Sequence, residues 1–118
     1  MNNKLSNLTV NILTYKTNKE ILENCINSIS KSVLINIVEN SNKFKDDEYF
    51  KKLDHNINII CTGNNLGYAA GHNYGISKVT TRYVLILNPD LICIDQYFNE
   101  IQNYIDEDVD FHIIGSQY

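Results

Sequence analysis

This sequence of 118 residues has few basic residues and no clustered cysteines. Its ten Lys and Arg residues are scattered and are outnumbered by fourteen Asp and Glu, which gives a formal net charge of −4. Nucleic-acid-binding domains are usually basic, so we expect no nucleic-acid partner. Cys25, Cys61 and Cys93 lie far apart and form no Cys-x-x-Cys motif or Cys/His cluster. This spacing makes a zinc site or a disulfide framework unexpected.

Long apolar runs are absent as well. No stretch approaches the roughly 20 apolar residues that a membrane-spanning helix needs, and residues 1–7 contain no apolar core of signal-peptide length. These absences predict a cytoplasmic protein, which could still work at a membrane surface through a partner. The length predicts a single domain over residues 1–118.

Strand-like apolar runs alternate with helix-like spacings along the chain, and this alternation is typical of α/β proteins. Strands are expected at 8–15, 33–39, 57–61, 83–87 and 111–114. Helices are expected after Thr17, around 47–53, from about 68, and after Asp95. Thr17 and Glu20 have the spacing of a capping box with Thr17 as N-cap. The apolar face of the first helix is expected to contain Ile21, Leu22, Cys25, Ile26 and Ile29. Repeated strand–helix–strand units predict a three-layer, Rossmann-like, mainly parallel sheet with helices on both faces.

Four of the five glycines recur at every fourth position between the third and fourth expected strands, at residues 63, 67, 71 and 75. On a helix that starts near Tyr68, Gly71 and Gly75 would share one face and permit close backbone approach. Gly67 suits the turn into this helix, whose first amides favour an anion such as a diphosphate. The alternative is that the glycines only allow tight helix–sheet contact. The spacing matches neither the dinucleotide fingerprint nor the Gly-Lys-Ser/Thr phosphate loop.

The apolar run 83–87 stops at Asn88-Pro89-Asp90. Pro89 removes a backbone donor and ends the strand. Asp90 is therefore expected at the carboxyl edge of a parallel sheet, where open α/β sheets bind their ligands. A carboxylate there could hold a divalent cation or a sugar hydroxyl, or it could merely cap the next turn.

Four segments carry a resemblance when they are taken together and in order: 10–15, 37–41, 65–75 and 87–90. They resemble the first half of a family 2 glycosyltransferase of the GT-A fold, with the rhamnosyltransferase-like branch as the nearest match. Each motif is weak alone, but the ordered set is specific and spans nearly the whole chain. The resemblance implies a glycosyltransferase that binds a UDP- or dTDP-sugar for transfer to a glycan or a lipid-linked acceptor.

The resemblance also implies roles for individual residues. Thr14 and Tyr15 would pack around the nucleotide, Glu39 would hold the base, and Asp90 would hold Mg²⁺ or Mn²⁺ at the diphosphate. The Asn-x-Gly segment would lie beside the ribose and diphosphate. The full set of implied donor-site residues is Thr14, Tyr15, Glu39, Asn40, Asn65, Gly67, Tyr68, Gly71, Asn73, Asn88 and Asp90.

Two departures from the family pattern concern the site. Glu39 stands where the family usually has Asp, so its carboxylate lies one methylene further out, and it could also be an ordinary solvated strand-end carboxylate. Asn88 replaces the first Asp of the usual Asp-x-Asp. With one carboxylate fewer, the metal would take most of its ligands from diphosphate oxygens and water.

A third departure is length, because family members continue well past this point with the acceptor pocket and the catalytic base. We therefore expect a donor-binding half truncated after the fifth strand, without transferase activity of its own. His55, His72 and His112 are unconvincing bases, and the catalytic base is unknown. An uncovered strand edge would recruit another chain, which predicts self-association through 111–118. Peripheral membrane association of the full-length enzyme stays open.

The resemblance predicts the spatial strand order 3-2-1-4, with the fifth strand near the fourth, and Thr14, Glu39, Gly67 and Asp90 together at one edge. Two other classes of function stay open. One is a non-catalytic nucleotide- or partner-binding α/β module. The other is a flavodoxin-like or receiver-type domain, although a receiver would need an acidic cluster after the first strand, where Thr14-Tyr15-Lys16 stands.

Overall fold

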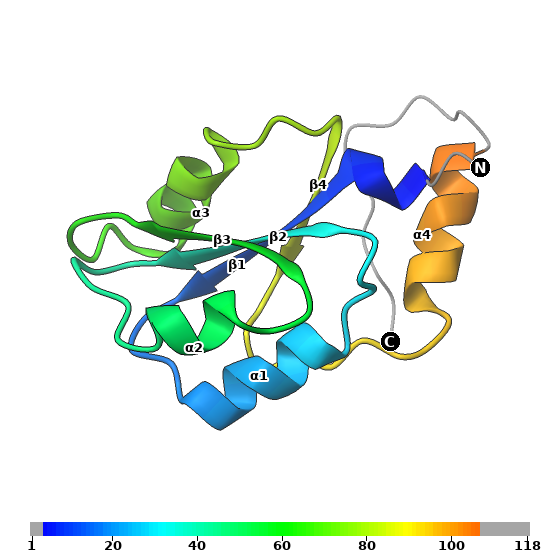
Figure 1. The fold of residues 1–118 in the computed structure, drawn as a ribbon. Coiled ribbons are helices and arrows are strands. Elements are labelled where there is room, and N and C mark those ends of the chain that lie inside the picture. The colour runs from blue at the N-terminus through cyan, green and yellow to red at the C-terminus, as the bar shows by residue number, and fades with distance from the viewer. Residues whose placement is uncertain (1–3, 107–118) are drawn as a thin grey trace.

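A four-stranded parallel sheet forms the centre of the molecule (Figure 1). The computed structural model describes residues 4–106. The strands are β1 (Leu8–Thr14), β2 (Leu34–Glu39), β3 (Asn56–Cys61) and β4 (Tyr83–Leu87), in the order β3-β2-β1-β4. The predicted order of these strands is confirmed, and all three pairings are parallel. The predicted fifth strand, 111–114, lies outside the described residues.

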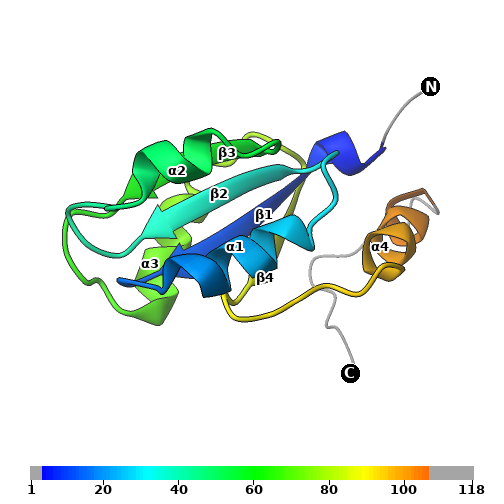
Figure 2. The same cartoon turned by 60° about the horizontal axis from the view of Figure 1, so that its bottom comes forward.

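Helices cover both faces of the sheet, as the sequence predicts (Figures 1 and 2). The helices α1 (Lys19–Asn27) and α2 (Asp47–Lys51) lie on one face, and α3 (Tyr68–Ile76) lies on the other. A last helix, α4 (Tyr97–Asp106), packs beside the short 3₁₀ helix η1 (Lys4–Asn7) at the end of the sheet. None of the helices in the described part of the chain is long and apolar enough to cross a membrane.

The main core lies between the sheet and α1. Alternate residues of β1 and β2 face this side in register, with Val10 beside Ile35 and Ile12 beside Ile37. All four side chains are fully buried, and Leu22 of α1 belongs to the same cluster. Branched aliphatic side chains on adjacent central strands match the composition expected for a parallel sheet that is covered on both faces.

The predicted starts of the first and the last helix need correction. Asn18, not Thr17, is the N-cap of α1, and its side-chain oxygen accepts from the amides of Glu20 and Ile21 at 2.9 and 3.1 Å. The helix therefore starts one residue later than predicted. Ile21, which was expected on the apolar face of the helix, is 47% exposed. The last helix begins at Tyr97, two residues beyond Asp95.

The glycines of α3 bring this helix unusually close to the sheet. A methyl group at Gly71 would lie 2.7 Å from Leu13 Cδ1, and one at Gly75 would lie 2.6 Å from Asn11 Oδ1. Real Cβ atoms essentially never approach other atoms this closely, so a side chain at either position would require its neighbours to shift. The tight helix–sheet contact raised from the sequence is therefore present at both glycines.

We expect Gly75→Ala to destabilise the chain despite the higher helix propensity of alanine. The added methyl would press on Asn11 and Val38, which are buried in the two central strands. Overpacking of this kind costs about 1–3 kcal/mol, against a propensity gain of at most about 1 kcal/mol. Urea denaturation of the purified chain measures the net loss.

Ala70→Ser is the matched control, because it adds one atom to the exposed side of the same helix. Its free energy of unfolding should stay within about 0.5 kcal/mol of the parent. Equal effects of the two substitutions would contradict the close approach of α3 to the sheet.

Candidate functional site at the carboxyl edge of the sheet

Parallel strands deliver their carboxyl ends to one edge of the sheet, and the predicted site residues follow these ends. Thr14 ends β1, Glu39 ends β2, and Asp90 comes three residues after the end of β4. Gly67 precedes α3 on the same side, where it accepts a hydrogen bond from Asn40. The placement of these residues on one edge follows from the parallel topology. Whether one nucleotide reaches all of them stays a prediction.

Glu39 is a buried carboxylate and not the solvated strand-end group that the sequence left as an alternative. Its residue exposure is 1%, as is that of Thr14. The Thr14 hydroxyl donates to Oε1 at 2.8 Å, while the Ser41 hydroxyl and the Lys16 amide donate to Oε2 at 2.6 and 3.3 Å. Buried polar groups are costly unless they are hydrogen-bonded, and here three donors stabilise the carboxylate.

Lys16 adopts a left-handed backbone conformation, with φ of +52°. It is the one described non-glycine residue with positive φ. This conformation costs about 1–2 kcal/mol for a residue with a Cβ atom. Strained residues of this kind persist where their surroundings hold them, often at functional sites. In this chain the bend points the Lys16 amide at Glu39, and no sequence signal predicted it.

Tyr15 and Lys16 form the exposed rim beside this buried carboxylate. The Tyr15 side chain is 50% exposed. The Lys16 ammonium lies 5.3 Å from the centre of its ring, within cation–π range. The predicted donor-site residue Tyr15 is therefore half-exposed at the end of β1, with the Lys16 ammonium over its ring.

Asn40 holds the loop between β3 and α3. Its side-chain NH₂ donates to Asn65 Oδ1 and to the Gly67 carbonyl, both at 3.1 Å. Its side-chain oxygen accepts from the Thr62 hydroxyl and the Leu66 amide, both at 3.0 Å. Because both of its NH₂ hydrogens and its oxygen are engaged within the protein, Asn40 shapes this loop.

Asn65 and Gly67 continue the same loop into α3. Asn65 Oδ1 accepts from the Gly67 amide at 2.9 Å, which closes a side-chain turn of the kind that Asn favours. Gly67 has φ of +88°, as expected for the turn before the helix, and it is the N-cap of α3. The loop is thus preshaped by Asn40, and the exposed residues 68–70 form the first turn of α3.

The first turn of α3 is joined to the Asn-Pro-Asp turn. The Tyr68 hydroxyl donates to Asn88 Oδ1 at 3.2 Å, and the Tyr68 ring packs edge-on against His72. Asn73, another predicted donor-site residue, lies on the exposed side of the helix. Gly71 lies on the opposite side, against Leu13 and Asn40, so its backbone packs on the sheet.

Asp90 is exposed, and no described residue forms an ion pair or a hydrogen bond with its carboxylate. The pKa of the Cys25 thiol in α1 is raised to about 12, chiefly by burial, then by Cys93 and then by Asp90. The negative charge of Asp90 therefore makes the smallest of these three contributions. The described residues contain no group of three or more His, Cys, Asp or Glu that could enclose a metal. A single exposed carboxylate fits a hard oxygen-seeking cation such as Mg²⁺ that draws its other ligands from substrate and water.

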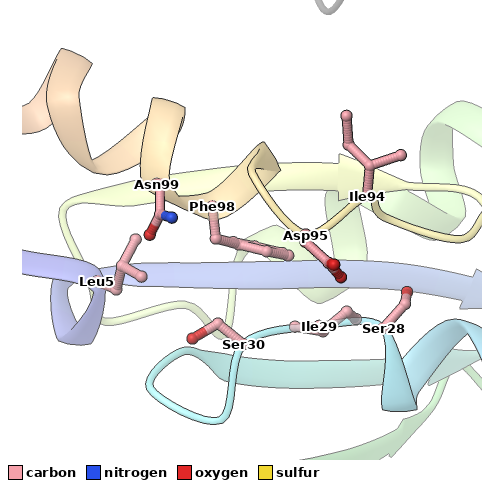
Figure 3. Close-up of a pocket in the computed structure, with 8 residues that line it drawn as sticks. All are labelled: Leu5, Ser28, Ile29, Ser30, Ile94, Asp95, Phe98 and Asn99. Carbon is pink, nitrogen blue, oxygen red and sulfur yellow. The ribbon is translucent and has the colours of Figure 1, made fainter.

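The cavity of about 240 Å³ lies away from this edge, between η1, the end of α1 and α4 (Figure 3). Its lining residues are Leu5, Ser28, Ile29, Ser30, Ile94, Asp95, Phe98 and Asn99. None of the predicted donor-site residues lines it. The predicted donor site is therefore separate from this cavity.

Sequence comparison connects the chain with known transferases. The sequence pattern of the family "Glycosyl transferase family 2" matches residues 9–118. The chain is similar to the low-salt glycan biosynthesis hexosyltransferase Agl10 of Haloferax volcanii, with 33% identity over 91 residues. That match covers 74% of this chain and 29% of Agl10.

Structure comparison agrees on the fold. The crystal structure of S. aureus TarS 1–349 has a TM-score of 0.72 with 17% identity, over 85% of this chain and 32% of TarS 1–349. The same protein in complex with UDP gives 0.72 with 16% identity. The matched part of the chain therefore covers less than a third of Agl10 and of TarS 1–349. At this identity the likeness to TarS shows a shared fold.

His72 makes stability depend on pH in a defined direction. It is 3% exposed, its Nδ1 lies 3.1 Å from Asn11 Nδ2, and its Nε2 has no hydrogen-bond partner in the described structure. Burial lowers the pKa of His72 below 6.5. The unfolded chain thus binds a proton at a higher pH than the folded chain, so stability should fall as the pH drops below about 6.5.

Urea denaturation at pH 7.5, 6.5 and 5.5 measures this loss, and His72→Gln should reduce it. His55, whose pKa is also lowered chiefly by burial, contributes in the same direction, so His55→Gln serves as the comparison. The lowered pKa of Asp54 acts only below about 3.8, outside this window. An unchanged pH dependence in His72→Gln would contradict the assignment.

Proposed function

This chain belongs to glycosyl transferase family 2, and from that membership we propose that it is the donor-binding part of a glycosyltransferase. In this proposal it binds a UDP- or dTDP-sugar at the carboxyl edge of the sheet. The sugar is then transferred to a glycan or a lipid-linked acceptor by the whole protein. The family match sets aside the flavodoxin-like and receiver-type alternatives.

One observation supports the proposal: two loops at the carboxyl edge of the sheet are each held by a buried polar side chain. The loop after β1 is held through Glu39, and the loop before α3 is held through Asn40. The half-exposed Tyr15 side chain directly follows β1, and the first amides of α3 directly follow the second loop. An aromatic face suits a nucleobase, and helix N-terminal amides suit a diphosphate.

The proposed metal is Mg²⁺ or Mn²⁺, with Asp90 as its protein ligand. Bound there, the ion would neutralise charge on the leaving diphosphate. Asp90 is the one charged residue of the Asn-Pro-Asp turn. The Asn88 side-chain oxygen accepts a hydrogen bond from the Tyr68 hydroxyl. The exposure of Asp90 leaves its carboxylate available for this role.

The proposal assigns no catalytic base to this chain. His72 is a buried residue of α3, His55 lies outside the carboxyl edge just before β3, and His112 lies outside the described residues. Deprotonation of the acceptor hydroxyl needs a base within hydrogen-bonding reach. We therefore propose that the base and the acceptor site belong to other parts of the full-length protein, which acts in the cytoplasm and at the membrane periphery.

Asp90→Asn should remove most of the metal-dependent binding of nucleotide while leaving the fold intact. Loss of one charged ligand corresponds to about a tenfold or greater loss of affinity. Calorimetry with UDP and dTDP, with and without Mn²⁺, measures this effect, and thermal denaturation checks the fold. Binding of either nucleotide diphosphate by the parent chain is also the direct test of the proposed function.

Asp95→Asn is the matched control for charge, because Asp95 is exposed in the same segment but lines the cavity away from the strand ends. It should bind UDP or dTDP with parental affinity in Mn²⁺. If Asp90→Asn did the same, Asp90 would be a turn residue and not a metal ligand.

We further propose that the 118-residue chain self-associates through 111–118 and does not transfer sugar by itself. Light scattering at micromolar concentration tests the first statement, and a monomer would refute it. An assay with donor and candidate acceptors tests the second. Transfer by the purified chain would mean that it contains a base that we have not assigned.

A further inference from the structure

A buried polar pair joins α3 to the centre of the sheet. Asn11 of β1 has an exposure of 0%, and His72 of α3 has an exposure of 3%. The Asn11 side-chain NH₂ donates to His72 Nδ1 at 3.1 Å, and it also lies 3.5 Å from the His72 carbonyl oxygen. Because Nδ1 accepts, the proton of the neutral imidazole is on Nε2. One side chain of a central strand therefore contacts both the ring and the backbone of His72.

The His72 ring packs against the ring of Tyr68, which lies one helical turn earlier on the same face of α3. The ring centroids are 4.6 Å apart and the ring planes meet at 68°, an edge-to-face contact. Tyr68 is 61% exposed, so most of its side chain is in solvent. The buried imidazole thus gives this exposed ring a fixed surface to pack on.

The Tyr68 hydroxyl connects the same pair to the Asn-Pro-Asp turn. It donates to Asn88 Oδ1 at 3.2 Å. No other hydrogen bond joins the Asn88 side chain to a described residue. Within the turn, the Leu91 amide donates to the Asn88 carbonyl at 3.2 Å. The turn that carries Asp90 is therefore tied to the start of α3 by a hydrogen bond whose donor packs on His72.

We infer that His72 is a positioning residue, which acts through Tyr68 to set where the Asn-Pro-Asp turn lies relative to the first turn of α3. This inference rests on the proposed donor site, in which Asp90 holds the metal and the first amides of α3 bind the diphosphate. A diphosphate and its metal need both groups at a fixed separation, because Mg²⁺ binds oxygens over a narrow range of distances. A side chain with 3% exposure offers little surface to a ligand, so the effect of His72 passes through its neighbour.

Two substitutions at residue 72 separate positioning from stability. His72→Gln keeps an acceptor for the Asn11 amide but removes the ring that supports Tyr68. We expect it to lower the affinity for the nucleotide diphosphate that the parent binds in Mn²⁺, UDP or dTDP, about fivefold. His72→Phe keeps a ring but leaves the Asn11 amide without its acceptor. It should lower the thermal midpoint more than His72→Gln does, yet keep nucleotide affinity within about twofold of the parent.

Calorimetry at a temperature where each variant is fully folded measures these affinities, and thermal denaturation measures the midpoints. A merely structural role of His72 would make affinity follow stability, so that His72→Phe would bind more weakly than His72→Gln. That order would overturn the inference, as would parental affinity in His72→Gln.

Tyr68→Phe tests the second step, because it removes the hydroxyl that donates to Asn88. It should lower the same affinity about fivefold. Combined with His72→Gln, it should bind at most about twofold more weakly than the weaker single variant, since both changes break one connection. Losses that multiply to about 25-fold would mean independent effects and would overturn the inference. Tyr74→Phe, at an exposed tyrosine of the same helix, is the matched control and should keep parental affinity.

The side-chain amide signals of Asn88 in nuclear magnetic resonance give a readout that needs no nucleotide. In the isotope-labelled 118-residue chain they should shift in Tyr68→Phe and in His72→Gln, and keep the parental position in His72→Phe. Unchanged Asn88 signals in His72→Gln would overturn the positioning role. If the parent chain binds neither UDP nor dTDP, the proposed function fails, and these signals still decide whether His72 holds the turn.

Discussion

The assembly of the carboxyl edge depends on the close contact of α3 with the sheet at Gly71 and Gly75. A Cβ atom at these positions would lie within 3.0 Å of Leu13 and Val38, so either these side chains or the helix would have to shift. The same contact brings the start of α3 to Asn40, which fixes the loop ahead of the helix. It also brings Tyr68 to the Asn-Pro-Asp turn of β4. A helix one or two ångströms further out would break both connections, so the glycine spacing controls the geometry of the whole edge.

Strand periodicity explains how two adjacent residues hold loops on opposite sides of this edge. Successive side chains of a strand point to opposite faces. Asn40 lies on the α3 face, near Gly71, and secures the 62–67 loop. Glu39 points to the other side, where its register partner Thr14 also lies, and secures Lys16. The adjacent residues Glu39 and Asn40 therefore hold two different loops, and both side chains form hydrogen bonds within the protein.

Local patterns in the sequence predicted the four described strands within one residue, because short branched apolar runs ended by polar turns are a local signal of buried strands. The edge itself was less predictable. Asn18, and not Thr17, is the N-cap of the first helix. Both residue types are favoured N-caps and they are adjacent, so the sequence pattern does not decide between them. The burial of Glu39 and the bend at Lys16 depend on contacts between residues 23 to 25 positions apart. No local pattern encodes these contacts, which bury the Glu39 carboxylate and supply its hydrogen-bond donors.

Hydrogen bonding, and not an opposite charge, stabilises the buried carboxylate, and this affects the electrostatics of the edge. Among the described residues Glu39 has no ion-pair partner, because the two ion pairs there join Lys31 to Asp54 and Lys51 to Asp47. The Asp90 carboxylate lies at the same edge and is likewise unpaired by described residues. Lys16 is the nearest cation in sequence to the end of β1, and its ammonium is directed toward the Tyr15 ring. In the proposed function, a diphosphate at this edge would lie near the exposed Asp90 carboxylate, and the two negative charges would repel each other. Helix N-terminal amides offset only about half an elementary charge. In the proposed function, a divalent cation between Asp90 and the diphosphate would offset the remaining repulsion.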